Sequence, residues 1–410
     1  MKRVVITGLG AITPIGNDIK TYWENLQAGK CGIDFITKYD TENFKVKIGA
    51  EVKGFDPSLY MDKGEIRRTD LYAQYALAAS IQAMEDSGLK DFDPTRMGVY
   101  IGSGIGGITT FYNDSVGLHT GGAGKVSPYF VAMMIGNIAA GIIAIRHKAQ
   151  GPVMSIVTAC ATSTHSIGDA FRAIKYGDAD IMLAGGSETG IHPIVNAGFT
   201  NCMALSQNNV PDDTSVPFDK RRSGFVAGEG GGVIVLEELE HAKKRGAKIY
   251  AEIAGYGNTC DAYHITAPSA DGSGAARAIK DALKEAKLKG DSLYINAHGT
   301  STPLNDKSET AAIKLALGEA KARKAVISST KSMIGHTLGA AGVLEAIAAI
   351  MALKDGVIPP TIGYKEPDPD CDLDYVPNAA RKLQVEGAIS TSMGFGGHNG
   401  CIAFKRYVEK

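Results

Sequence analysis

This 410-residue sequence has almost no net charge, no long hydrophobic run and no closely spaced pair of cysteines. The formal net charge is −1, from 43 Lys and Arg against 44 Asp and Glu, so no global positive field is present to hold nucleic acid or an anionic membrane. A net charge near zero does not exclude a local patch of basic residues. Hydrophobic residues make up 44% and charged residues 21%, which is typical of a globular protein with a large core.

The cysteines do not form any of the common metal or redox motifs. No C-x-x-C pair occurs, so neither a zinc ribbon nor a dithiol site is expected. Scattered cysteines in a long chain are typical of reduced thiols, and they predict a cytoplasmic protein. The six are Cys31, Cys160, Cys202, Cys260, Cys371 and Cys401.

The most hydrophobic segments do not indicate a membrane protein. Gly8 and Gly10 interrupt the N-terminal run VVITGLGAI, which fits a strand and a glycine turn better than a signal peptide. The longest apolar stretch, residues 131–145, contains Asn137 and is shorter than the ~20 residues needed to span a bilayer. We predict a buried helix there.

Glycine is abundant and follows short apolar runs. The 50 glycines cluster in segments such as GVYIGSGIGG, INAHGTST and GFGGHNG. Helical patterns over residues 69–87 and 274–286 lie between such runs. This alternation predicts an α/β fold with its functional residues at strand ends.

Two segments of the chain resemble each other. The spacing from Cys160 to Lys331 equals that from His165 to His336, 171 positions in both cases, with Ile, Gly and Ala also in register. Chance similarity of two strand–helix units is one explanation. We favour a duplicated fold, with halves 1–250 and 251–410, and we expect the same turn to hold Cys160 in one half and Lys331 in the other.

Cys160 is the candidate nucleophile. A β-branched run precedes it and a Ser/Thr-rich helix start follows it, in SIVTACATSTHSIG. A strained strand-to-helix turn suits a nucleophile, and a helix N-terminus is expected to lower the thiol pKa. An inert buried cysteine is the alternative explanation.

Two histidines are candidates for the same site. His298 ends a predicted strand before a Gly/Ser/Thr loop, and His336 follows Lys331 by five residues. Each alone is also explained by packing or capping. His165 is assigned a structural role, and the absence of an H-E-x-x-H spacing makes a metal site unexpected.

Two acidic residues and a glycine loop complete the candidates. Asp306 and Glu309 lie three apart on a predicted helix, and Lys331 is a plausible partner for one of them. A surface ion pair is the simpler explanation. The loop 394–400, GFGGHNG, suits a mobile segment, a backbone amide donor or a plain tight turn.

Together these motifs resemble the β-ketoacyl-acyl carrier protein synthases, specifically the type II elongating enzymes of bacterial fatty-acid synthesis. The resemblance covers nearly the whole chain, through VVITGLGAITPIGN, PFDKRRSGFVAGEGGG, AHGTSTPLND, STKSMIGHTLGAAG and GFGGHNG. It implies an α/β thiolase-like fold, five αβαβα layers built from two similar halves. It also implies a homodimer.

The resemblance assigns the chemistry residue by residue. It implies that Cys160 is the acylated nucleophile and that His298 and His336 are the catalytic histidines. It gives Lys331 a catalytic role, with Glu309 as its ion partner. The implied reaction is a decarboxylative condensation in which a thiolate takes the acyl group and two neutral imidazoles stabilise an enolate. No metal or organic cofactor is required.

The resemblance also assigns binding residues. Phe395 matches a gatekeeping residue whose N–H joins that of Cys160 as an oxyanion hole, and Ile105 matches a position lining the acyl pocket. Thr300 and Thr302 match positions that bind the pantetheine arm of acyl carrier protein. The positions that match the basic residues facing the carrier are Arg67, Arg68 and Lys125.

The chain departs from the family pattern in places. His398 stands where many relatives carry Thr, and Gly64 and Met203 occupy places where a familiar relative has basic residues. The carrier is therefore expected to bind a rearranged patch.

Two related functions are alternatives. A ketosynthase subunit of an aromatic polyketide system shares these motifs and works with a partner chain. A non-catalytic chain-length subunit lacks the nucleophile, so Cys160 argues against it. A Cys-His-Asn starter enzyme or a two-Cys thiolase is disfavoured because both His298 and His336 are present.

Overall fold

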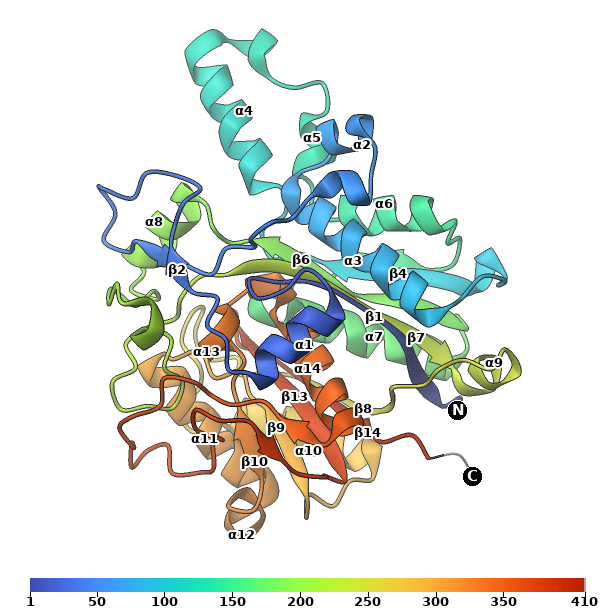
Figure 1. Cartoon of the computed structure of the whole chain (residues 1–410), viewed down its shortest axis with the longest axis vertical. Coiled ribbons are helices and arrows are strands. Elements are labelled where there is room, and N and C mark those ends of the chain that lie inside the picture. Colours follow the sequence, from blue (N-terminus) through green and yellow to red (C-terminus); the bar gives the residue numbers. More distant parts are fainter. Residues whose placement is uncertain (409–410) are drawn as a thin grey trace.

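The computed structural model describes residues 1–408 and contains one ten-stranded sheet, which divides into two groups of five strands (Figure 1). The strand order is β10-β9-β13-β14-β8-β1-β7-β6-β4-β5. The first group comprises β1 (Val4–Ile12), β4 (Met97–Gly102), β5 (Val153–Met154), β6 (Ile181–Thr189) and β7 (Glu229–Glu238). The second comprises β8 (Ala251–Cys260), β9 (Leu293–Asn296), β10 (Val326–Ser328), β13 (Gly387–Gly394) and β14 (His398–Lys405).

The two groups repeat one topology. In the first, β4 is parallel to β5 and β6, whereas β7 runs antiparallel to β6 and β1. In the second, β9 is parallel to β10 and β13, whereas β14 runs antiparallel to β13 and β8. The groups join where β1 pairs with β8, at Val4 opposite Ile253. The predicted construction from two similar halves is confirmed.

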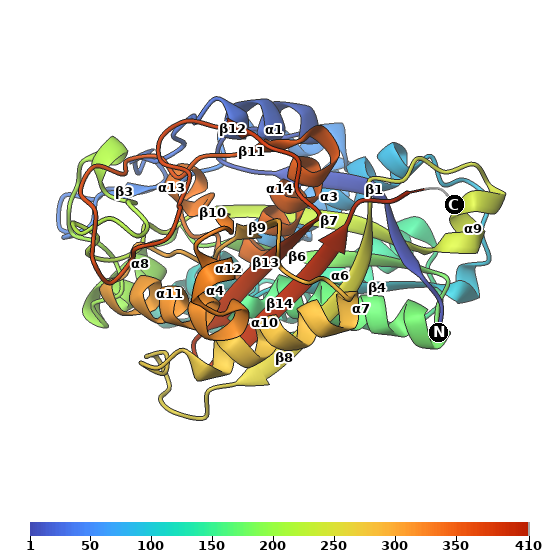
Figure 2. The same ribbon diagram turned by 90° about the horizontal axis from the view of Figure 1, so that it is seen from below.

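Helices form three layers around these strands (Figures 1 and 2). The helices α3 (Leu71–Ser87) and α6 (Ile138–His147) pack on the first group from outside, and α10 (Ser273–Ala286) packs on the second with α11 (Pro303–Leu317) beside it. Between the groups lie α7 (Thr162–Tyr176) and α14 (Ala341–Asp355), which contact each other. This gives the five predicted αβαβα layers. Within residues 1–408, no helix is both long and apolar enough to cross a membrane.

Paired glycines set the outer packing in both halves. A Cβ on Gly8 or Gly10 would lie 2.1 or 1.9 Å from a carbonyl oxygen of α3. A Cβ on Gly255 or Gly257 would lie 2.0 or 1.9 Å from a carbonyl oxygen of α10. Only glycine allows this approach of helix to strand. The interrupted N-terminal run is therefore the first strand, as predicted.

The central helices correct the predicted register of the repeat. A 3₁₀ turn opens each helix, Ala159–Ala161 before α7 and Leu338–Ala340 before α14, and the first residue of each has φ 51°. The equivalent of Cys160 is therefore Gly339, and the predicted pairing with Lys331 is wrong. The reason is an extra helix, α13 (Lys331–Ile334), in the connection from strand to turn of the second half.

The long apolar stretch is also corrected. Residues 131–145 do not form one buried helix, because α5 (Phe130–Met134) ends before α6 begins. Val131 is 63% and Ile145 80% exposed, whereas Ile143 faces the core. The predicted helices at 69–87 and 274–286 are confirmed as α3, capped by Asp70, and α10.

Shorter elements complete the chain. The remaining helices are α1 (Ile19–Gln27), α2 (Lys63–Arg67), α4 (Ile108–Gly121), α8 (Pro193–Asn201), α9 (Leu239–Lys244) and α12 (Glu319–Ala322). Two small hairpins pair β2 (Asp34–Phe35) with β3 (Ile48–Gly49) and β11 (Val357–Ile358) with β12 (Arg381–Lys382).

Candidate active site

Cys160 lies in the turn between β5 and α7, at a point where the backbone is strained. The preceding residue, Ala159, has φ 51°, which is unfavourable for a side chain with a Cβ. The turn presents Cys160 to a cavity of about 370 Å³, and the backbone N–H of Phe395 faces the thiol. The predicted strained turn is therefore present.

The predicted lowering of the Cys160 pKa is wrong. The residue is half-buried, but its thiol is shielded from bulk water, and this desolvation raises the pKa to about 12. The charge of Lys331 and the N–H of Phe395 oppose the rise without cancelling it, and Glu188 adds to it. Proximity to a helix start does not offset the loss of solvent. The thiol is therefore protonated at neutral pH and needs a proton acceptor when it reacts.

His298 and His336 come together beside Cys160 in the cavity wall. Their ring centroids are 5.3 Å apart at 87°, and each residue is 2% exposed. Burial, followed by the charge of Lys331, holds both pKa values well below the usual range. Both imidazoles are therefore neutral at neutral pH.

Both imidazoles are held in one tautomer. Lys331 Nζ donates to His298 Nδ1 at 3.3 Å, and the N–H of Leu338 donates to His336 Nδ1 at 3.3 Å. A nitrogen that accepts carries no proton, so Nε2–H is the free donor of each ring. The Nε2 of His336 is buried and has no partner within residues 1–408. The pair thus offers two N–H groups to the cavity.

Lys331 forms its ion pair with Glu345, so the predicted pairing with Glu309 is wrong. Glu345 projects from α14, and both side chains are 1% exposed. Burial raises the pKa of Glu345 to about 7, and Lys331 opposes that rise. The sequence does contain a signal for it: Glu345 is the single charged residue of AGVLEAIAAIMAL, a segment otherwise typical of a buried helix.

Glu309 supports the His298 turn. Its carboxylate accepts from the N–H groups of His298 and Gly299 at 2.8 and 2.7 Å, and from Thr391 Oγ1 at 2.8 Å. Burial raises its pKa to about 7. Asp306 is also fully buried on α11 and accepts from Phe218 N at 2.8 Å. Neither belongs to a surface ion pair.

The cavity includes some of the predicted binding residues and not others. Thr300 and Thr302 line it, with their hydroxyl oxygens 3.0 Å apart, and Phe395 closes one side. Ile105 does not line it: its side chain is 39% exposed and its N–H donates to Glu188. Other lining residues include Phe199, Cys202, Met203, Phe225, Asp261, Pro268, Leu304 and Asn399.

Glu188 is a buried carboxylate that sequence reasoning missed. It sits on β6, has no cationic partner among residues 1–408, and accepts from Ser103 Oγ at 2.7 Å and Gly104 N at 2.7 Å. It also accepts from Gly339 N at 3.1 Å. Glu188 therefore links the loop after β4 to the turn that opens α14. Its position in GGSETG, after a buried strand, was the available signal.

The GFGGHNG segment is the turn between β13 and β14. Gly396 and Gly397 have φ 89° and 77°, and Asn399 Nδ2 donates to Asp261 Oδ1 at 2.7 Å. A Cβ on Gly394 would lie 3.3 Å from the backbone N of Cys160, so the turn packs on Cys160. His398 faces His165, with ring centroids 6.3 Å apart.

His165 is held by hydrogen bonds on both ring nitrogens. Nδ1 lies 2.8 Å from Thr158 Oγ1, and Nε2 lies 3.4 Å from the carbonyl oxygen of Asn399. Burial lowers its pKa to about 4. These contacts fit the structural role predicted for it.

The three basic candidates lie away from the cavity wall. Arg67 ends α2, Arg68 follows it with its guanidinium 5.6 Å from the Tyr129 ring, and Lys125 closes a turn after α4. In Figure 1 these elements gather at one end of the molecule, with α2 beside α5. Met203, where a basic residue was expected, lines the cavity and is 84% exposed.

Comparison with known proteins places this geometry in a family. Residues 1–242 match the model described as Beta-ketoacyl synthase, N-terminal domain, and residues 250–365 match Beta-ketoacyl synthase, C-terminal domain. The chain is 51% identical over 410 residues to 3-oxoacyl-[acyl-carrier-protein] synthase 2 of Synechocystis sp., covering 99% of this chain and 98% of that relative.

Solved structures agree on the fold. The ishigamide ketosynthase/chain length factor superposes with a TM-score of 0.93 at 36% identity, covering 99% of this chain and all of that one. A type II PKS acyl-carrier protein in complex with its ketosynthase bound to the hexaketide gives 0.92 at 37% identity, with the same coverage. The predicted thiolase-like α/β fold is therefore confirmed.

Proposed function

The chain belongs to the β-ketoacyl synthase family, and we propose that it condenses malonyl-acyl carrier protein with a Cys160-bound acyl chain during fatty-acid elongation. The observation that carries this proposal is the cavity in which Cys160 meets two neutral imidazoles, each with a free Nε2–H. A nucleophile beside two uncharged donors suits a reaction in which a thioester is first transferred and an enolate then forms.

Acyl transfer is the first step. The Cys160 sulfur attacks the acyl thioester, the C–S bond to the carrier breaks, and the proton of the Cys160 thiol passes to the departing carrier sulfur, which leaves as a thiol. A thiol pKa near 12 means that almost no free thiolate is present at pH 7. Proton removal therefore accompanies the attack. Because both ring Nδ1 atoms already accept hydrogen bonds and both Nε2 atoms carry protons, the leaving sulfur is the acceptor of the thiol proton.

Decarboxylation is the second step. The malonyl C–CO₂ bond breaks, CO₂ leaves, and the electron pair forms an enolate whose oxygen accepts from His298 and His336. Neutral donors stabilise this oxygen without supplying a ready proton to the carbanion. Lys331, neutralised by Glu345, keeps the His298 tautomer, while Glu309 fixes the backbone at His298.

Carbon–carbon bond formation is the third step. The enolate carbon attacks the acyl carbonyl on Cys160, and the tetrahedral oxyanion accepts from the N–H groups of Cys160 and Phe395. Collapse expels the Cys160 sulfur, which takes up one proton, and releases the β-ketoacyl thioester. The close packing of Gly394 on Cys160 N supports this pair of donors, because it brings the two backbone segments together.

The direct test is to incubate the purified chain with an acyl-carrier thioester and labelled malonyl-carrier. We expect CO₂ release matched by β-ketoacyl-carrier, with an acyl adduct on Cys160 in mass spectrometry. An adduct on another cysteine, with Cys160→Ala still condensing, would contradict the assignment.

The alternative is a ketosynthase subunit of an aromatic polyketide system. The ishigamide ketosynthase/chain length factor and a type II PKS ketosynthase share the fold, at 36 and 37% identity against 51% for the 3-oxoacyl-[acyl-carrier-protein] synthase 2, which favours elongation. The discriminating result is activity without a second type of chain. A requirement for a partner chain before any condensation occurs would favour the polyketide function.

We infer that acyl carrier protein is the partner, steered by Arg67, Arg68 and Lys125. Exposed charges act mainly on association rate and salt dependence. Arg68→Glu should raise the KM for carrier-bound substrate and weaken its salt dependence, while a pantetheine substrate without the carrier is nearly unaffected. Equal losses on both substrates would mean a structural role for Arg68.

We also propose a homodimer, with domains dividing at residue 250 and a cytoplasmic location. The support for the dimer is the apolar edge of the first group of strands, where β5, the last strand of the sheet, exposes Val153 and Met154. A monomer by sedimentation at micromolar concentration, with full activity, would contradict it. The unpaired state of the six cysteines supports a reducing compartment.

A further inference from the structure

The loop that carries Thr300 and Thr302 has a backbone that its own residues do not favour. Ser301, between them, has φ 67°, a left-handed conformation that costs energy for a residue with a Cβ. Surrounding contacts must therefore hold the loop. Those contacts decide where the two threonine hydroxyls lie in the cavity.

The segment around PFDKRRSGF, which lies earlier in the chain, supplies these contacts. The N–H of Val216 donates to Ser301 Oγ at 2.9 Å, and the N–H of Gly224 donates to the Ser301 carbonyl oxygen at 3.0 Å. Arg222 adds a side-chain contact, because its Nη2 donates to the carbonyl oxygen of Pro303 at 3.3 Å. The loop is thus held on both sides of Thr302.

Arg222 is itself fixed from the opposite direction. Its Nη1 donates to Asp368 Oδ2 at 2.5 Å and to the Asp219 carbonyl oxygen at 3.0 Å. Its Nε lies 4.0 Å from Asp306 Oδ2, and its side chain is 6% exposed. A planar guanidinium held at several points is rigid and cannot be replaced by the single point charge of lysine.

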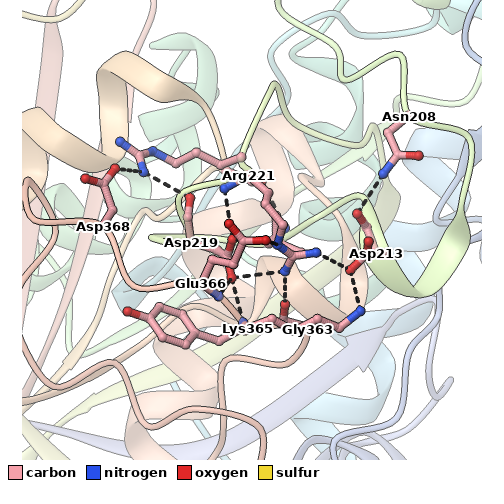
Figure 3. Close-up of polar contacts among 12 residues, drawn as sticks. Asn208, Asp213, Asp219, Arg221, Gly363, Lys365, Glu366 and Asp368 are labelled. Atoms are coloured by element: carbon pink, nitrogen blue, oxygen red, sulfur yellow. Dashed lines mark hydrogen bonds and ion pairs between the residues drawn. The ribbon is translucent and has the colours of Figure 1, made fainter.

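Arg221 provides an internal contrast one residue away. It makes two hydrogen bonds to the Asp219 carboxylate, at 2.9 and 3.0 Å, and others to Asp213 and the Gly363 carbonyl oxygen, at 2.6 and 2.8 Å (Figure 3). None of these partners belongs to the loop 299–303. Arg221 therefore shares the network of Arg222 without reaching the cavity wall.

We propose that Arg222 is a positioning residue for binding of the pantetheine arm, acting through Pro303 on the adjacent Thr302 and its partner Thr300. This rests on the proposed function, in which those threonines bind the arm. The catalytic His298 has separate supports, since Glu309 holds its N–H and Ser329 Oγ donates to the Gly299 carbonyl oxygen at 2.7 Å. Disturbing Arg222 thus weakens substrate binding and leaves the chemical step in place.

The experiment compares Arg222→Lys with the matched control Arg221→Lys in the full chain. We expect Arg222→Lys to raise the KM for malonyl-pantetheine about tenfold, as for one charged hydrogen bond, with kcat within about twofold. Alkylation of Cys160 by iodoacetamide, which has no arm, should stay within about twofold. Arg221→Lys should leave all three within about twofold.

A double-mutant cycle makes the test specific. If Arg222 acts through the threonine loop, Arg222→Lys should add little to the KM of Thr300→Val, whereas independent effects would multiply. Should Arg222→Lys fail to fold, Asp368→Asn removes the anchor of Nη1 and should raise KM in the same direction.

The outcomes separate the two proposals. Equal effects of the two arginine variants, a loss confined to kcat, or multiplicative effects in the cycle would overturn the role of Arg222. A wild-type chain that does not turn over malonyl thioesters would instead overturn the proposed function.

Discussion

The two halves of the molecule share a scaffold and differ in what stands at the same place. Each half has a 3₁₀ turn that begins with a residue at φ 51° and opens a 15-residue central helix. In the first half the middle of that turn is Cys160, and in the second it is Gly339. The duplicated turn supplies a nucleophile once only.

The second half places its chemistry around the turn instead. The added helix α13 brings Lys331, and His336 lies between it and the turn. At the position on α7 that corresponds to Glu345, the first half has Ser166, whose hydroxyl bonds to the carbonyl of Thr162. In the proposed mechanism, one half therefore provides the nucleophile, and the other provides the donors and the buried charge that orients them.

The largest expected effect comes from replacing Cys160, the proposed nucleophile of the first half. Cys160→Ala should lower condensation at least about 10⁴-fold, because no second nucleophile occupies the turn of the other half. Cys160→Gln, which resembles an acylated cysteine in shape and polarity, should still release CO₂ from labelled malonyl-carrier. If neither variant releases CO₂, decarboxylation depends on the first half as well, and the division of labour is wrong.

The same residue gives a pH test. With a thiol pKa near 12, alkylation of Cys160 by iodoacetamide should rise about tenfold per pH unit between pH 8 and 10 without levelling off. The pKa is raised, so the thiolate fraction keeps growing across this range. A plateau below pH 9 would instead favour the stabilisation by the helix start that the sequence suggested.

Replacing either proposed N–H donor of the second half, His298 or His336, should have the next largest effect. His298→Ala and His336→Ala should each lower CO₂ release about 10²- to 10³-fold, as expected for loss of one preorganised donor. Acyl transfer to Cys160 should remain measurable in both. His165→Gln is the control, since His165 lies outside the cavity wall and its loss should leave CO₂ release within about fivefold. Wild-type CO₂ release from either Ala variant would return that histidine to a packing role.

The orienting charge can be tested through pH. The charge of Lys331 lowers the pKa of His298, so Lys331→Met should raise that pKa and move the acidic limb of CO₂ release to higher pH. Lys331→Arg keeps the charge and should leave the limb in place. Glu345→Gln leaves Lys331 without its partner and should cost about 3–5 kcal/mol of unfolding free energy in urea. An unmoved limb in Lys331→Met would contradict the electrostatic link.

The residues that local patterns could predict were those at strand ends. Cys160 follows a short β-branched run and His298 follows the short run LYINA, so the place of each at a strand end was visible in the sequence, as was the layered α/β fold. Glu345 and Glu188 were missed because their partners are remote in the chain. Both glutamates also lie on buried elements, where the apolar sequence pattern indicates only packing. The register of the repeat failed for a related reason: Lys331 resembles the Cys160 segment locally, and only the backbone turn identifies Gly339 as its counterpart.

The pKa of Cys160 shows a second limit. The sequence places the thiol near a helix start, which is a local feature, and the structure confirms it. Its solvation depends on the packing of Phe395 and on the cavity wall, to which residues from both halves contribute. Because desolvation is a property of the assembled site, no pattern around residue 160 could have predicted its sign.

The smallest expected effect tests whether the two strained turns are equivalent. Ala159→Gly removes a Cβ from a left-handed residue, and this relief, partly offset by greater freedom of the unfolded chain, should raise the unfolding free energy by about 0.5 kcal/mol. Leu338→Gly gives the same relief but deletes a side chain that is 4% exposed and packs with Phe225 beside Cys160, so a net loss of about 2–4 kcal/mol is expected. Urea unfolding of both variants measures the difference.

The N–H of residue 338 remains in the glycine variant, so His336 keeps its tautomer and CO₂ release should survive wherever the protein stays folded. Equal changes in stability would mean that Leu338 contributes only its backbone, whereas loss of CO₂ release from a folded Leu338→Gly would show that its side chain, and not only its N–H, holds His336.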